Sequence, residues 1–257
     1  MMSCTVWNDP SGPERKPGKM RTIGIIGAME VEVEKLKKDM EMTGTVSKAG
    51  MVFCEGTLAG KHAVVVRSGV GKVNAAVCTQ ILADEFGVDA VINTGIAGSL
   101  NAAIDIGDIV LSTDVVHHDV DVTNFGYPPG QVPQMDAFSF EADGQLADLA
   151  EEICGKVNPE IHVFRGRIAS GDQFISDRAV KKKIAETFGA LCTEMEGAAI
   201  AHTAFLNRIP FLIIRAISDK ADDSATMDYD VFEERAARHS VRLTEGLLEA
   251  LQDQRPL

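Results

Sequence analysis

The stretch Phe211-Leu-Ile-Ile-Arg-Ala-Ile-Ser-Asp-Lys-Ala-Asp-Asp223 decides the fold, because it combines a buried strand with an unexpected charge. Its apolar run follows Pro210, is long enough for a buried strand and is too short to span a membrane. Arg215 lies inside that run, and Ser218 and Asp219 follow it. A guanidinium in a buried strand is costly unless a carboxylate or a ligand compensates it. The strand therefore either carries a structural ion pair, such as Arg215 with Asp219, or ends in a functional site.

Composition and charge narrow the class of protein. The chain has 257 residues, of which 45% are hydrophobic and 25% charged, as is typical of one large or two small globular α/β domains. The net charge of −13 argues against nucleic acids and acidic membranes as partners, but it permits a small neutral substrate. No apolar run could span a membrane and no signal peptide is recognisable, so we expect a cytoplasmic protein. The five scattered cysteines indicate reduced thiols rather than a disulfide framework or a zinc site.

The first residues differ in composition from the rest of the chain. Three prolines and two glycines interrupt any regular pattern over residues 1–19. We therefore expect a flexible leader over residues 1–19 and a single domain over residues 20–257.

Strand-like apolar runs alternate with helical patterns along this domain. The predicted strands are residues 22–27, 51–58, 62–67, 89–94, 108–116, 161–169, 191–195 and 211–218. The predicted helices are residues 28–40, 72–86, 146–157, 179–188, 197–206 and 229–251, and a long loop is expected over 119–136. Such alternation favours a layered α/β fold with a largely parallel or mixed sheet.

Several predicted strands end in small residues beside a polar or charged group. The strand ends with these residues are Gly27 followed by Glu30 and Glu32, Thr94-Gly95 followed by Gly98, Ser170-Gly-Asp172, Glu194-Met-Glu196, and Arg215 followed by Ser218 and Asp219. In open α/β sheets ligands bind at the carboxyl ends of the strands, so these groups predict a shared acidic pocket. It would hold three or more carboxylates and one arginine, with glycines that let a ligand approach the backbone.

The chemistry of this pocket favours a sugar over a phosphate. Gly24-Ile-Ile-Gly27 lacks the spacing of a dinucleotide-binding motif, and Gly69-Val-Gly-Lys72 is too short for a P-loop. Carboxylates accept hydrogen bonds from sugar hydroxyls, and they stabilise a developing cation. Cleavage at an anomeric carbon needs both properties, since its transition state resembles an oxocarbenium ion. One carboxyl group can then activate water while another protonates the leaving group.

Seven segments, in order, resemble the family of 5'-methylthioadenosine/S-adenosylhomocysteine nucleosidases of the nucleoside phosphorylase superfamily. They are Gly24–Val33, Ser68–Lys72, Asn93–Gly98, His118–Tyr127, Ser170–Ile175, Glu194–His202 and Arg215–Asp219. The resemblance covers roughly residues 20–251 and implies a three-layer α/β/α fold with a central mixed, twisted sheet flanked by helices. It implies hydrolysis of the N-glycosidic bond to release adenine and a 5-thioribose product, in methionine salvage and the activated methyl cycle. No cofactor and no metal are implied, and 5'-deoxyadenosine is an open further substrate.

The resemblance also implies roles for single residues. Glu32 resembles the base that activates the attacking water, and Asp219 resembles the acid that protonates adenine N7. Glu196 resembles the residue that holds the ribose hydroxyls, and Arg215 the group near Glu196 and the water. Phe174 resembles the stacking partner of adenine. The other substrate-binding positions that it implies are Ala97, Gly98, Ile175 through its backbone, Met195, Ser218 and Tyr229 on the 5' side.

A second subunit is also implied. Val122, Phe125 and Pro133 resemble the part that crosses to a neighbouring subunit and closes its 5'-alkylthio site. We therefore expect a homodimer in which the 122–133 loop completes the partner's pocket.

Alternatives stay open at this point. Ile96 stands where the family often has Ser or Thr, so a side-chain hydrogen bond to the water is lost, although a backbone N–H could still serve. A purine nucleoside phosphorylase would need arginines near the first glycine loop to hold phosphate, where this chain has Glu30 and Glu32. A nucleosidase for another adenosine-type nucleoside, such as aminofutalosine, is hardly distinguished by the sequence. Glu194 and Glu196 could also simply cap the helix that follows them.

Overall fold

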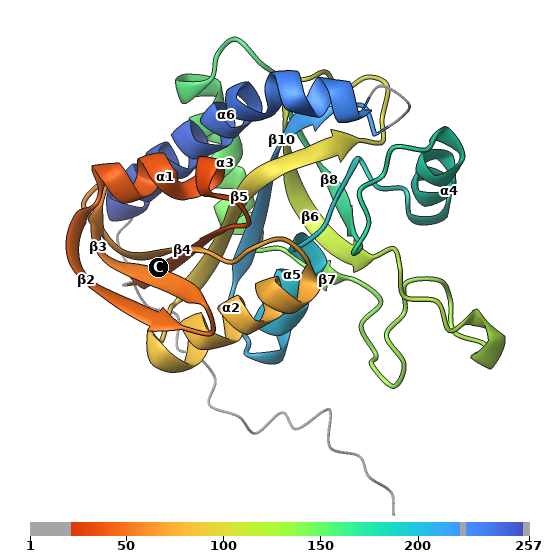
Figure 1. Ribbon diagram of the computed structural model, residues 1–257, viewed down its shortest axis with the longest axis horizontal. Helices are drawn as coiled ribbons and strands as arrows, with labels where there is room; N and C mark the ends of the chain where they lie inside the picture. Colours follow the sequence, from red (N-terminus) through yellow and green to blue (C-terminus); the bar gives the residue numbers. More distant parts are fainter. Residues whose placement is uncertain (1–21, 222–224, 254–257) are drawn as a thin grey trace, which may run out of the picture.

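The computed structural model describes residues 22–221 and 225–253 (Figure 1). The predicted leader over residues 1–19 lies outside the described residues. Within the described part of the chain, no helix is both long enough and apolar enough to cross a membrane.

The described residues form one mixed, ten-stranded sheet. Its strands are β1 Thr22–Gly27, β2 Glu41–Lys48, β3 Met51–Leu58, β4 Lys61–Arg67, β5 Ala90–Ser99, β6 Ile109–His117, β7 Phe140–Glu141, β8 Val163–Ser170, β9 Cys192–Glu194 and β10 Phe211–Asp219. The strand order is β10-β6-β8-β9-β5-β1-β4-β3-β2, β7 pairs with β6, and β10 also pairs with β5. Strands β10, β6, β8, β9 and β5 therefore close into a ring, from which β1, β4, β3 and β2 extend. Because β5 is parallel to β1 and β10 but antiparallel to β9, the predicted mixed sheet is confirmed.

Helices cover both faces of this sheet. They are α1 Glu30–Asp39, α2 Lys72–Glu85, α3 Gly144–Val157, α4 Arg178–Phe188, α5 Gly197–Leu206 and α6 Ala225–Asp253, with a single 3-10 turn at Thr123–Phe125. In Figure 1, α1, α3 and α6 lie on one side of the strands and α2 and α5 on the other. Two separate hydrophobic clusters match these two interfaces, so the predicted three-layer arrangement is confirmed.

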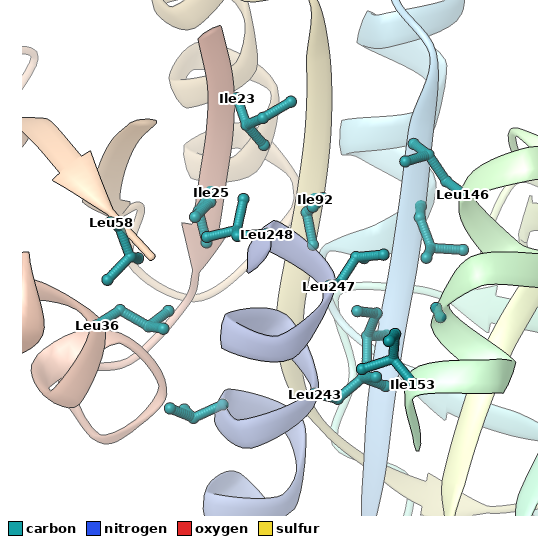
Figure 2. Close-up of a cluster of buried hydrophobic side chains, with 14 of the residues drawn as sticks. Ile23, Ile25, Leu36, Leu58, Ile92, Leu146, Ile153, Leu243, Leu247 and Leu248 are labelled. Carbon is teal, nitrogen blue, oxygen red and sulfur yellow. The ribbon is translucent and has the colours of Figure 1, made fainter. Parts of the chain in front are cut away.

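The largest cluster fixes α6 over the middle of the sheet (Figure 2). Leu243 and Leu247 are one helical turn apart, and together with Leu248 they are fully buried against β1 and β5. Their partners there include Ile25 and Ile92. Complete burial of one such side chain contributes about 1.5–3 kcal/mol. This packing holds in place the two strands whose carboxyl ends carry pocket residues.

The structure differs from the sequence-based prediction at β5. We expected a strand that ends at Thr94 with Gly95–Gly98 as its exit, but β5 continues to Ser99 and all of its residues are buried. The reason is tertiary, because β10 pairs with this segment from Arg215 opposite Gly95 to Asp219 opposite Gly98. The glycine-rich segment is thus part of the sheet, and it brings β10 alongside the pocket.

Candidate active site

A pocket of about 330 Å³ opens where β1, β5, β9 and β10 end. It is lined by Ala28, Met29, Glu32, Val70, Ile96, Ala97, Gly98, Phe174, Thr193, Glu194, Met195, Glu196, Ser218 and Asp219. Its volume is in the range typical of small-molecule sites. The predicted carboxylates at the strand ends are confirmed, since four of them line the pocket, but the predicted arginine is not among the lining residues.

Glu32 is held by the backbone on both sides. It lies in the first turn of α1, and its Oε2 accepts hydrogen bonds from the N–H groups of Ala28 (2.6 Å) and Met29 (2.9 Å). Its Oε1 accepts one from the Ile96 N–H at 3.2 Å. Burial raises the pKa of Glu32 above its ordinary value, against the opposing effects of the Arg215 charge and these N–H groups. A buried carboxylate with a raised pKa is suited to accept a proton.

Two glycines make room for the carboxylates. A Cβ atom at Gly95 would lie 2.8 Å from Glu32 Oε1 and 3.1 Å from Arg215 Nη1. A Cβ atom at Gly98 would lie 2.7 Å from Asp219 Oδ1. Any side chain at either position would therefore displace a charged group of the site.

Arg215 lies behind the pocket wall and not on it. Its Nη2 donates to Glu194 Oε2 at 2.5 Å and to Asn93 Oδ1 at 2.5 Å. Burial alone would raise the pKa of Glu194, but the Arg215 charge and the hydrogen bond from the Ser170 hydroxyl hold that pKa below its usual value. The buried strand thus carries an ion pair between Arg215 and Glu194, while Asp219 faces the pocket.

Glu194 also has the capping role that the sequence suggested. Its Oε2 accepts from the N–H groups of Glu196 (3.1 Å) and Gly197 (2.7 Å), at the N-terminus of α5. Glu196 instead turns toward the loop before α2, where its Oε1 accepts from the Gly71 N–H at 2.8 Å. One of the two glutamates is therefore the cap, and the other is available to a ligand.

Loss of the buried ion pair is expected to destabilise the fold. Glu194→Gln leaves Arg215 buried without its counter-charge, which costs about 3 to 5 kcal/mol in the free energy of unfolding. Urea denaturation of the variant and the wild type measures this difference. Glu34→Gln, which removes an exposed pair with Lys38, is the matched control and should leave the midpoint unchanged. Equal midpoints for Glu194→Gln and the wild type would contradict a structural role of the pair.

Glu196 is the pocket carboxyl group with the largest stated pKa shift. Burial, followed by the neighbouring Glu194 charge, raises the pKa of Glu196 to about 8.

Asp219 is buried and oriented by its neighbours. Its Oδ1 accepts from the Ala221 N–H at 2.7 Å, and its Oδ2 accepts from the Ser218 hydroxyl at 2.9 Å. Only 2% of Asp219 is exposed, yet it lines both the main pocket and a smaller recess beside it. A carboxyl group in this position can meet a flat ligand at its edge.

The recess beside Asp219 is formed by the loop after β8. Gln173, Phe174 and Ile175 line it, together with Met195 and Gly98. Phe174 is 49% exposed and lines both the main pocket and this recess, so part of its ring is accessible from the pocket. The structure thus brings Phe174 and Ile175 together at one end of the pocket, as the resemblance implied.

Other predicted site residues lie elsewhere. Val122, Phe125 and Pro133 do not line this pocket, and Phe125 is 78% exposed on the long loop after β6. Tyr229 falls in α6, but its side chain lies outside the described residues. Asp172 lies at the rim, where its carboxylate accepts from the Lys72 N–H at 2.8 Å.

Sequence reasoning missed several lining residues. Ala28, Met29, Val70 and Thr193 line the pocket without having been predicted as site residues. Ala28, Met29 and Val70 lie inside segments that carry the family resemblance, and that resemblance could have identified them as lining residues. Thr193 precedes such a segment, and only the pairing of β9 with β5 opposite Gly98 brings it to the pocket.

Two histidines contact each other outside the lining of this pocket. His117 Nε2 lies 3.3 Å from His202 Nδ1, beside the ring of Phe140. Within residues 22–221 and 225–253, no group of three or more His, Cys, Asp or Glu side chains is placed to hold a metal ion.

Comparison with known proteins agrees with this geometry. A family model described as the phosphorylase superfamily matches residues 22–249. A 5'-methylthioadenosine/S-adenosylhomocysteine nucleosidase of Chromohalobacter salexigens is 45% identical over 233 residues, which cover 90% of this chain and 98% of that protein.

Solved structures show the same likeness. The Neisseria meningitidis 5'-methylthioadenosine/S-adenosylhomocysteine nucleosidase in complex with methylthio-immucillin-A matches with a TM-score of 0.86 and 42% identity, over 90% of this chain and 100% of that one. The futalosine hydrolase of Helicobacter pylori matches with a TM-score of 0.85 and 33% identity, over 90% of this chain and 98% of that one. The chain therefore belongs to the phosphorylase superfamily and, within it, to the family of 5'-methylthioadenosine/S-adenosylhomocysteine nucleosidases.

Proposed function

We propose that the protein hydrolyses the N-glycosidic bond of 5'-methylthioadenosine and S-adenosylhomocysteine, releasing adenine and the 5-thioribose product. The observation that carries this proposal is that Glu32, Glu196 and Asp219 line one pocket. A protein that only binds nucleosides needs neither a water-activating base nor a proton donor. Relatives over 40% identical along nine-tenths of the chain carry the same activity in their names.

The proposed mechanism assigns one step to each carboxyl group. Glu32 takes a proton from water as the water oxygen attacks the anomeric carbon and the bond to the adenine nitrogen breaks. Asp219 gives its proton to adenine N7, so that adenine leaves as a neutral base. Glu196 accepts hydrogen bonds from the ribose hydroxyls, and the positive charge that develops on the sugar is stabilised by the nearby carboxylates. These steps use side chains of the chain alone, without a metal or cofactor.

The remaining parts of the site follow from the same proposal. Adenine stacks on Phe174 and is bound by the backbone of Ile175, while Met195 packs against the ribose. Arg215 acts from behind the wall, because its charge keeps Glu194 ionised and limits the rise in the pKa of Glu32. The 5' side of the ligand is assigned to Tyr229.

A homodimer completes the proposal. The loop that carries Val122, Phe125 and Pro133 extends away from the sheet (Figure 1). Phe125 is 78% exposed on this loop, and aromatic side chains are enriched at protein–protein interfaces. We assign it to the 5'-alkylthio end of the pocket in a second copy of the chain. The four described cysteines are all buried and free, which fits a reducing compartment such as the cytoplasm.

The direct test is adenine release from 5'-methylthioadenosine in phosphate-free buffer. We expect full activity there and no stimulation by added phosphate, because Glu30 and Glu32 occupy the place where a phosphorylase needs arginines. Inosine is the control substrate and should not be cleaved. A strict phosphate requirement would replace the hydrolase by a phosphorylase.

A nucleosidase for another adenosine-type nucleoside is the second candidate. Because the chain is similar to a futalosine hydrolase, aminofutalosine should be tested as a substrate in the same assay. Aminofutalosine cleaved faster than both thioadenosine substrates would make it the principal activity, and the carboxylate chemistry would stay the same.

A further inference from the structure

The start of α2 and the loops after β6 and β8 are joined beside the pocket by a closed set of hydrogen bonds. Lys72 Nζ donates to Asp119 Oδ1 at 2.5 Å, and the Asp172 N–H donates to Asp119 Oδ2 at 2.9 Å. The Lys72 N–H donates to Asp172 Oδ1 at 2.8 Å, which closes the ring. We call Lys72, Asp119 and Asp172 the rim triad.

Two members of the rim triad are partly buried, and the third, Asp172, is exposed. The side chains of Lys72 and Asp119 are 19% and 17% exposed. Burial would raise the pKa of Asp119, but the hydrogen bonds from Lys72 and the Asp172 N–H lower it overall, so the carboxylate is ionised. Lys72 is also the first residue of α2, whose free N–H groups favour a carboxylate such as that of Asp172. The triad therefore consists of three contacts to carboxylates, of which the Lys72–Asp119 ion pair is half-buried and the two that involve Asp172 are exposed.

Each end of the triad continues directly into the pocket. On one side, Gly71 precedes Lys72, and its N–H holds Glu196 Oε1 at 2.8 Å. On the other side, Asp172 is two residues before Phe174, which lines the pocket. Asp119 itself does not line the pocket, so it can affect a ligand only through these neighbours.

We infer that Asp119 is a positioning residue that sets the distance between Phe174 and Glu196. Joining Lys72 to the backbone of Asp172 fixes the loop of the stacking ring relative to the group that holds the sugar. The inference rests on the proposed function, since it assigns the base to Phe174 and the ribose to Glu196. Its consequence is that the long loop after β6, in which Asp119 is the second residue, is coupled to base binding.

Asp119→Asn is the test. An asparagine of the same shape cannot accept hydrogen bonds on both sides, so one contact of the triad is lost. We expect the Kd for adenine and the KM for 5'-methylthioadenosine to rise about tenfold, with kcat lowered less than about threefold. Isothermal titration and steady-state kinetics measure these values. Lys72→Met breaks the triad from the other side and should act in the same direction.

Asp114→Asn is the matched control. Asp114 lies on β6, is similarly buried and is paired with Arg167, but it has no connection to the pocket loops. It should lower the melting temperature and leave the Kd for adenine unchanged. Combining Asp119→Asn with Phe174→Ala gives a further readout, the Kd for adenine, that a purely structural role of Asp119 would not change in this way. In that background, Asp119→Asn should change the Kd for adenine less than about twofold, because the ring that it positions is gone.

Three results would overturn the inference. These are an unchanged Kd for adenine in both Asp119→Asn and Lys72→Met, an equal loss in Asp114→Asn, and a full tenfold loss that persists with Phe174→Ala. Each leaves the proposed function intact provided that the wild type releases adenine. A wild type that neither binds adenine nor cleaves the nucleoside would refute the proposed function itself.

Discussion

Asp219→Asn should lower the rate of adenine release about a thousandfold while changing adenine affinity only severalfold. Asparagine has nearly the same shape, and its oxygen can still accept the hydrogen bond from the Ala221 N–H. It has no acidic proton for N7, so the leaving group would depart as an anion. General acid catalysis contributes about 10² to 10⁴ in rate, and a poor leaving group places this step at the upper part of that range. Single-turnover measurement of adenine release gives the rate of the chemical step.

A second buried aspartate controls for the effect of the substitution on the fold. Asp108 accepts hydrogen bonds from the N–H groups of Asp105 and His162, away from the pocket. Asp108→Asn should lower stability without lowering turnover more than severalfold. If Asp219→Asn keeps a rate within tenfold of the wild type, another group must protonate the base.

Glu32→Gln should reduce turnover by about 10² to 10⁴ as well, by removing the base that takes the proton from water. The amide can still accept at one oxygen, but it cannot serve both the Ala28 and Met29 N–H groups and the Ile96 N–H as the carboxylate does. Adenine affinity should persist, because Glu32 is assigned to the water and not to the base. The comparison of kcat with the Kd for adenine separates these effects.

The pH profile gives an independent readout of Glu32. Burial raises its pKa, and a base works only in its ionised form, so activity should fall as the pH drops through that raised value. Glu32→Gln should have a low residual rate without this acid limb. A variant that keeps both the wild-type rate and the wild-type profile would assign water activation elsewhere.

The local sequence pattern was sufficient to predict the helices and strands that have strong apolar periodicity. The helix over residues 197–206 and the strands over 22–27 and 51–58 lie where the pattern predicts them. The carboxylates at strand ends also predicted an acidic pocket, because parallel strands present their carboxyl ends at one edge. These inferences depend on neighbours in the sequence or on a general property of sheets.

Features that depend on distant neighbours were not predictable in the same way. β2 was missed because it is the edge strand of the sheet and seven of its eight residues are exposed, so it lacks an apolar alternation. The partner of Arg215 was not predicted, because the sequence suggested Asp219 or Glu196, whereas the pairing of β9 and β10 with β5 brings Glu194 to the guanidinium. The contact of Lys72 with Asp119 joins residues 47 positions apart and has no local signature.

The closed ring of strands has a consequence for how the chain folds during synthesis. β5 is made early, but its partner β10 begins at Phe211, more than a hundred residues later. Until β10 emerges, the edges of β5 and β6 that it pairs with are open, and unpaired edges favour association with other chains. The nascent protein therefore has no assembled catalytic centre until its C-terminal part has been translated. Its long-range strand pairing also predicts slow folding for a protein of this size.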